Sequence, residues 1–304
     1  MKLVLFCLLL LISFTLFAKD IYFETAFQGD YSAEPTNYKS SIGFEYFKKF
    51  STDYGDFLTA DLQVRLAHNF ENEKSTLEIH NAWLEYKYDL GKFIRVGHFA
   101  PAFGIEKVLD THSTLWQTNA MQNVGFKQDW GIGYRSFIGD FDYSFSAQTG
   151  SGMSLRKDGF LLSGRSASSS SNAFQFAFSA LYGDIHRVMS MATYPVERST
   201  EIINKKRIAL EVQYNFGAYY FKNEISAGYN DKKKIISNFA EFEFKSFTLI
   251  NFNFIVQNKY FKIDKNETIN WLSGASYKFW EIFTLSFLYD ISDENLQIKL
   301  YYFN

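Results

Sequence analysis

Residues that commonly do chemistry are few in this 304-residue chain, and their spacing does not suit catalysis. None of the five histidines lies in a metal-binding pattern such as HExxH. Asp110, His112 and Ser113 bring three catalytic residue types together, but a hydrolytic triad is defined by its geometry and not by adjacency. The only cysteine, Cys7, lies in an apolar N-terminal run, so the rest of the chain has no thiol chemistry. The sequence therefore predicts no enzyme, no metal site and no cofactor.

A long connection, Ala100–Lys127, carries the first set of candidate functional residues. These are Phe103, Glu106, Lys107, Asp110, His112 and Trp116. A connection of this length without strands is usually functional or disordered, and its apolar content argues against disorder. Two interpretations remain open. The connection narrows a pathway to which its acidic residues and His112 are exposed, or it packs on a wall through its aromatic residues and only fills space.

The elements that would position these residues have a period of two. In Asn81–Tyr88, the side chains of Ala82 and Leu84 point to one face and those of Trp83 and Glu85 to the other, as in a β-strand. Similar runs of roughly 9–12 residues, the length that a tilted transmembrane strand needs, recur about sixteen times from Lys19 onward. The three prolines lie outside these runs, as strand hydrogen bonding requires. We predict sixteen strands, with fourteen or eighteen as alternatives.

The N-terminus predicts export. Met1–Lys2 is a short positive region, and Leu3–Phe17 is an apolar run of 15 residues, too short for a membrane-spanning helix. Residues 1–18 are therefore predicted to be a signal peptide, and 19–304 a single domain. Without Lys2, 30 basic residues face 33 acidic ones, which argues against binding of nucleic acid.

Composition and connection lengths predict the fold. Aromatic content is 19% while the mean hydropathy is only −0.18, as in membrane barrels with aromatic girdles. In hydrocarbon every backbone N–H and C=O must be paired, which requires a closed sheet. We predict an all-β fold: a closed antiparallel transmembrane β-barrel whose long third loop folds into the lumen. Short turns are expected on the periplasmic side and longer loops on the other. The longer connections are Asp30–Tyr38, Asn69–Ser75, Ala100–Lys127, Gly183–Lys205 and Lys259–Glu267.

The second set of candidates lies on the inward face of the runs, where we count ten basic and eleven acidic residues. The predicted pore-lining residues are Asp61, Arg65, Glu85, Arg95, Asp129, Arg135, Arg165, Arg207 and Glu211. Anion selection needs a ring of one sign, which these near-equal numbers do not provide. Most of these charges are expected to pair across neighbouring strands and stiffen the wall. His80 and His98 fall on the lipid-facing side, and Lys232–Lys234 on a loop that faces solvent or lipopolysaccharide.

Three segments, Ala82–Tyr86, Ile94–Glu106 and Gln128–Ile132, resemble the central part of the phosphate-selective porin (O and P type) family of outer-membrane barrels. Gln148–Gly152 is similar to that family's glycine motif at a strand end. The resemblance implies a water-filled sixteen-stranded barrel, often a homotrimer, in which an inward-folded third loop narrows the pore. The family's phosphate selectivity depends on an excess of inward Arg and Lys, and this sequence departs from that pattern.

Together these observations predict a porin in the bacterial outer membrane, reached through the periplasm after signal-peptide cleavage. It would let small hydrophilic solutes diffuse passively, in contact with outer-membrane lipid and lipopolysaccharide. The alternative is a barrel scaffold whose lumen holds a periplasmic or secreted partner protein. Apolar residues on the inward face would favour this scaffold; the candidates are Phe239, Ile255, Leu272 and Leu288.

Overall fold

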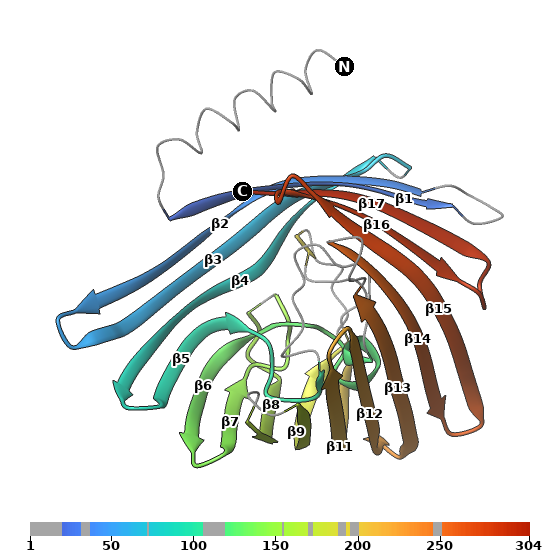
Figure 1. Cartoon of the computed structure of the whole chain (residues 1–304). Helices are drawn as coiled ribbons and strands as arrows, with labels where there is room; N and C mark the ends of the chain where they lie inside the picture. Colours follow the sequence, from blue (N-terminus) through green and yellow to red (C-terminus); the bar gives the residue numbers. More distant parts are fainter. Residues whose placement is uncertain are drawn as a thin grey trace.

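The alternating runs form the wall of a closed antiparallel β-barrel in the computed structural model (Figure 1). The structure describes residues 20–31, 37–71, 73–105, 119–153, 155–169, 173–187, 193–194, 201–245 and 251–304. The predicted signal peptide therefore lies outside the described residues.

The described chain has sixteen wall strands, eight to sixteen residues long. They are β1 (Ile21–Tyr31), β2 (Asn37–Thr52), β3 (Gly55–Asn69), β4 (Lys74–Asp89), β5 (Lys92–Phe99), β6 (Asp129–Ile138), β7 (Phe141–Gln148), β8 (Phe160–Ser168), β9 (Phe174–His186), β11 (Ile202–Phe216), β12 (Tyr219–Asn230), β13 (Lys233–Lys245), β14 (Phe252–Ile263), β15 (Asn266–Phe279), β16 (Phe283–Asp290) and β17 (Asn295–Phe303). The predicted all-β class and strand number are confirmed.

Two short elements are not part of this wall. β10 (Thr193–Tyr194), in the connection between β9 and β11, pairs with Leu77 and Glu78 of β4. α2 (Ala120–Asn123) is a single helical turn in the connection between β5 and β6. Within the described residues, no helix has the length and apolar character needed to cross a membrane.

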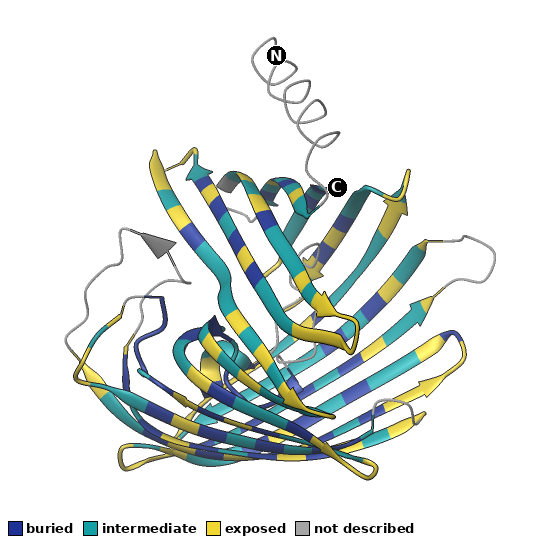
Figure 2. Ribbon diagram, turned by 90° about the vertical axis from the view of Figure 1, so that its left-hand side faces the viewer, coloured by how far each residue is buried: buried dark blue, intermediate teal, exposed yellow. Residues whose placement is uncertain are grey.

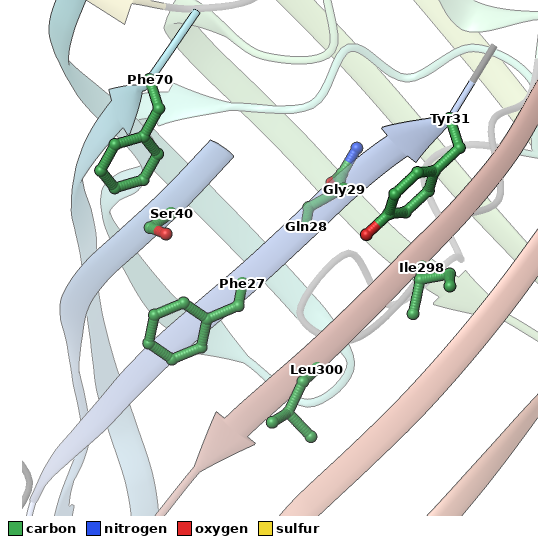
Figure 3. A pocket seen from close by; sticks show the side chains of 8 residues that line it. All are labelled: Phe27, Gln28, Gly29, Tyr31, Ser40, Phe70, Ile298 and Leu300. Atoms are coloured by element: carbon green, nitrogen blue, oxygen red, sulfur yellow. The ribbon is translucent and has the colours of Figure 1, made fainter. Parts of the chain in front are cut away.

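The barrel closes where β1 pairs with both β2 and β17 (Figure 1). Phe27 of β1 lies opposite Leu300 of β17 and Ser40 of β2. The small residues Gly29 and Ser40 leave a hollow of about 450 Å³ on the outer side of this seam, bordered by Phe27, Tyr31 and Leu300 (Figure 3). Closure leaves the sheet without a free edge at the seam, as a spanning sheet requires.

The two faces of the wall differ in exposure, visible as alternating stripes of buried and exposed residues along the strands (Figure 2). In β11, Leu210 is 62% exposed on the outer face, whereas its neighbour Glu211 is 1% exposed on the inner face. Most exposed large side chains of the strands are apolar or aromatic, while many of the buried ones are charged or polar. An apolar exterior and a polar interior are what a sheet needs between lipid and water.

The prediction of a long loop at Lys259–Glu267 is wrong. β14 continues to Ile263 and β15 begins at Asn266, so the turn contains only Asp264 and Lys265. Asp264 has φ 52°, in the left-handed region that Asp tolerates. The polar residues near the end of this hairpin belong to its strands, because at the rim of a barrel both faces of a strand meet polar surroundings.

The predicted lipid-facing position of His80 is also wrong. The register of β3 and β4 shifts between Gln63 and Val64, which leaves His80 without an opposite residue. One extra residue exchanges the two faces of a strand. His80 Nε2 accordingly lies 3.3 Å from Glu78 Oε2. Glu78 is the residue of β4 directly opposite inward-facing Arg65 of β3. His98 shares the face of Ala82 but is fully buried, with its ring 5.1 Å from that of Trp130.

Candidate functional site at the inner wall

The first flank of the connection between β5 and β6, residues 100–105, lies against the inner wall. The backbone N–H groups of Ala102, Gly104 and Ile105 donate hydrogen bonds to inward-facing side chains of strands far from β5 in sequence. The acceptors are Ser163 Oγ of β8 (2.9 Å), Ser179 Oγ of β9 (3.2 Å) and Glu224 Oε2 of β12 (2.8 Å). This flank therefore crosses the inner wall from β5 towards β12.

Glu224 also binds the second flank of the connection, residues 119–128. Its Oε1 accepts a hydrogen bond from Asn123 Nδ2 at 3.0 Å, and Asn123 Oδ1 in turn accepts one from Ser226 Oγ at 2.9 Å. Asn123 is the last residue of α2, and Glu224 and Asn123 are both buried. One carboxylate thus binds Ile105 before, and Asn123 after, the central part of the connection.

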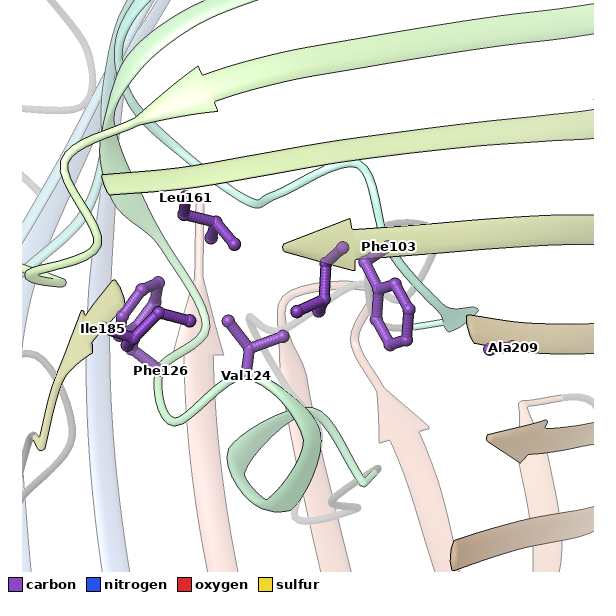
Figure 4. Close-up of a cluster of buried hydrophobic side chains, with 7 residues drawn as sticks. Phe103, Val124, Phe126, Leu161, Ile185 and Ala209 are labelled. Carbon is purple, nitrogen blue, oxygen red and sulfur yellow. The ribbon is translucent and has the colours of Figure 1, made fainter. Parts of the chain in front are cut away.

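An apolar cluster completes the contact (Figure 4). It joins three residues of the connection to four residues of the wall: Phe103, Val124, Phe126, Leu161, Leu181, Ile185 and Ala209. Nearby, Lys205 Nζ donates to the carbonyl of Val124 at 2.6 Å. Phe103 is only 4% exposed and packs within this cluster. The other predicted residues of the loop, Glu106, Lys107, Asp110, His112 and Trp116, lie outside the described residues.

Four of the five predicted pore-lining arginines form ion pairs with inward carboxylates. The pairs are Arg65–Glu24 (2.7 Å), Arg95–Glu85 (2.7 Å), Arg135–Asp142 (2.7 Å) and Arg165–Glu211 (2.6 Å). Two of them join adjacent strands, as expected from the sequence. Arg65 and Arg165 instead reach over an intervening strand, where Gly43 and Ser179 are the residues opposite them.

The remaining predicted pore-lining residues have other surroundings. Asp129 is fully buried; its carboxylate accepts hydrogen bonds from the backbone N–H of Gly150 (2.6 Å) and the hydroxyl of Thr149 (2.7 Å). It therefore fixes the connection between β7 and β8. Arg207 is buried and donates to the carbonyl of Tyr229 at 2.6 Å and to Asn230 Oδ1. Asp61 lies on the inner wall and is buried as well.

Glu224, Asn123, Ser179 and Lys205 were missed as site residues. Strand periodicity places Glu224 on the inward face, but nothing in the sequence separates it from ten other inward acids. No three His, Cys, Asp or Glu side chains gather as metal ligands in the part of the chain that the structure describes.

Comparisons with known proteins identify the class of fold. No protein-family model matches the chain, and no curated protein sequence matches it. Among solved structures, Pseudomonas putida OprB is 8% identical, with a TM-score of 0.66 over 93% of both chains. OmpF of Salmonella typhi, solved with daunomycin, is 11% identical, with a TM-score of 0.64 over 94% of this chain and 97% of that one. A loop-deletion mutant of Vibrio cholerae OmpT is 11% identical, with a TM-score of 0.63 over 94% and 98%.

The chain therefore has the sixteen-stranded barrel fold of the porins. At these identities the likeness extends to the fold alone, and the resemblance to the phosphate-selective porins stays a prediction.

Proposed function

We propose that this protein is an outer-membrane porin, a pore for passive diffusion of small hydrophilic solutes. The observation that supports this most directly is the inversion of polarity across one closed wall. Apolar and aromatic side chains cover the outer face, and ion-paired charges line the inner face. Such a wall is stable only with hydrocarbon outside and water or polar protein inside.

The connection between β5 and β6 is proposed to form the constriction. Glu224 and the apolar cluster fix both described flanks of this connection at one region of the wall. Glu106, Lys107, Asp110, His112 and Trp116 are proposed to narrow the pathway and set the size limit for solutes. A loop held on a rigid wall suits this role, since a size limit requires a fixed cross-section.

The inner wall favours weak ion selectivity over phosphate selection. Arg65, Arg95, Arg135 and Arg165 each have a carboxylate partner, so their charge is largely neutralised where it would act on a passing ion. A selective anion pore would need cations without such partners. We therefore infer that the resemblance to phosphate-selective porins reflects architecture and not solute choice.

Placement in the membrane follows from the chain ends and turns. Phe23 N donates to the carbonyl of Asn304 at 2.6 Å, so both ends of the barrel chain meet at one rim. In bacterial barrels this rim is periplasmic, and the longer loops face the cell exterior. We propose this orientation, export by the predicted signal peptide at residues 1–18, contact with lipopolysaccharide, and assembly as a homotrimer.

The scaffold alternative is not favoured. Its apolar candidates Phe239, Ile255, Leu272 and Leu288 are at most 5% exposed within the single chain. They offer no apolar surface for a partner protein to cover. A partner in the lumen would have to bind through the polar wall instead.

Reconstitution of the purified protein into planar lipid bilayers tests the proposal. We expect stepwise conductance that rises linearly with voltage and a reversal potential close to zero in a KCl gradient. Liposomes that contain the protein should swell in small sugars and stop swelling above a size limit. Folded protein that inserts but carries no current would refute the pore and leave the scaffold.

A further inference from the structure

A row of alternating tyrosine and lysine side chains crosses the outer face of four neighbouring strands. Tyr182 of β9 lies opposite Lys206 of β11, Lys206 lies opposite Tyr229 of β12, and Tyr229 lies opposite Lys234 of β13. The four residues are therefore in register, directly beside one another across the sheet. We call them the Tyr–Lys row.

The Tyr–Lys row faces outward. Lys206 and Lys234 are exposed and Tyr229 is 49% exposed, whereas the next residues along two of the strands, Arg207 and Ile235, are buried on the inner face. The Lys206 ammonium lies 5.5 Å from the centroid of the Tyr182 ring. The positive charges are thus held on the outer surface, beside aromatic rings.

The apolar belt begins immediately next to this row. Two residues further towards the middle of β11 lies Ile208, which is exposed, and Leu210 and Ile225 continue the same exposed apolar surface. Two residues of a strand span about 7 Å. The lysines therefore lie at the edge of the surface that hydrocarbon covers, at the rim opposite the chain ends.

Among the described residues, the neighbouring acids accept hydrogen bonds from backbone groups and form no ion pair with this row. Asp231 accepts a hydrogen bond from the backbone N–H of Asn204 at 2.9 Å, and Asp264 accepts one from the backbone N–H of Lys234 at 3.0 Å. The nearby Lys262 has its own partner, Glu267, at 3.5 Å. Within the described residues, neither the Lys206 nor the Lys234 ammonium forms an ion pair, so both are available to an external anion.

We propose that the Tyr–Lys row binds a phosphoryl group of an outer-leaflet glycolipid such as lipopolysaccharide. Lys206 and Lys234 lie two strands apart, about 10 Å between backbones, with Tyr229 between them. Both ammonium groups can reach one phosphoryl group from its two sides, and the Tyr229 hydroxyl can donate a hydrogen bond to it. The acyl chains of the same lipid then lie along Ile208, Leu210 and Ile225. The inference rests on the proposed function only in placing this rim at the cell surface.

Lipid binding by the full-chain barrel in neutral detergent tests this inference, with bis-phosphorylated lipid A as the probe. Near an anionic lipid surface each lysine contributes on the order of 1 kcal/mol, so Lys206→Gln or Lys234→Gln should weaken binding about fivefold and the double variant about 30-fold. Tyr229→Phe should weaken it by a smaller factor. The matched control is Lys245→Gln with Lys278→Gln, which removes two lysines at the opposite rim and should leave the affinity unchanged.

Further arms separate the possible outcomes. Fully dephosphorylated lipid A should bind the wild type as weakly as lipid A binds the double variant, and inorganic phosphate should not compete. An unchanged affinity in the folded double variant, or an equal loss in the control pair, would overturn the inference. Conductance in bilayers without lipid A should be the same for the double variant and the wild type, so a failed lipid site and a failed pore give different results.

Discussion

The Arg65 guanidinium of β3 reaches across β2 to the Glu24 carboxylate of β1, with Nη2 and Oε2 2.7 Å apart. Gly43 of β2 lies in register between them and makes this contact possible. Tyr301 of β17 donates its hydroxyl to the same carboxylate at 2.7 Å. Side chains from β3 and β17 thus converge on Glu24 of β1 at the seam where the barrel closes.

The first prediction concerns Gly43. A Cβ atom there would lie 2.4 Å from the carbonyl oxygen of Val64 and 2.9 Å from both Arg65 Cγ and Glu24 Oε1. Gly43→Ala should therefore lower the free energy of unfolding by about 1–3 kcal/mol, as overpacking does. Urea unfolding in detergent measures this change. Ser41→Ala, on the same face of β2, is the control, and equal stability of the two variants would contradict the prediction.

The second prediction concerns the pair itself. The side chains of Arg65 and Glu24 are 8% and 1% exposed, so Glu24→Gln leaves a buried guanidinium without its counter-charge. Removing one partner of a buried pair costs about 3 kcal/mol or more, whereas replacing both is often nearly neutral. The double variant Glu24→Gln, Arg65→Met should therefore recover most of the stability lost in Glu24→Gln. A double variant less stable than the single one would show that the pair does not act as a unit.

The third prediction concerns the anchor of the β5–β6 connection. Glu224→Ala removes the acceptor of Ile105 N and of Asn123 Nδ2, so both flanks lose their shared contact. We expect a broader distribution of single-channel conductance and more open-channel noise, since the connection is no longer held in one position. Glu243→Ala is the control, because Glu243 is an inner-wall acid whose ion pair is with Lys245. Identical single-channel recordings from Glu224→Ala and Glu243→Ala would contradict the prediction that Glu224 anchors the connection.

The fourth prediction couples Gly104 to the same carboxylate. Gly104 has φ +70°, and a Cβ atom there would lie 2.6 Å from Glu224 Oε2. Gly104→Ala should therefore disturb conductance as Glu224→Ala does. In the Glu224→Ala background it should add less than it does alone, because the clash is gone and only the cost of the left-handed backbone remains. If the effects of Gly104→Ala and Glu224→Ala were fully additive, the prediction that these two residues are coupled would be wrong.

The fifth prediction tests charge balance on the wall. The Arg95 guanidinium lies 2.7 Å from Glu85 and 3.9 Å from the centroid of the Trp83 ring. Glu85→Gln should free Arg95 and shift the reversal potential in a KCl gradient towards anion preference, whereas Arg95→Gln should shift it towards cation preference. The double variant should return close to the wild-type value. Shifts of the same sign in both single variants would contradict the prediction that this pair lines the pathway.

Strand periodicity was enough to predict the sixteen wall strands, because alternation between lipid and a polar interior is a local requirement on each strand. It also placed Arg65, Arg165 and Glu211 on the inner face. It failed where one residue is added, at His80, and where a polar strand end resembles a loop, at Lys259–Glu267. Neither feature can be recognised from residue composition, because the bulge at His80 and the polar strand ends at Lys259–Glu267 contain the same residue types as ordinary strands and loops.

By itself, the sequence determined the class of fold, the faces of most strands and the near balance of inward charge, since each depends on residues a few positions apart. Only the tertiary structure decided which charges meet and where the long connection is held. Arg65 meets Glu24 across Gly43, and Glu224 binds both Ile105 and Asn123, through contacts between residues 41 to 119 positions apart. Such contacts are set by register and curvature once the cylinder closes, and no local pattern of residues encodes them.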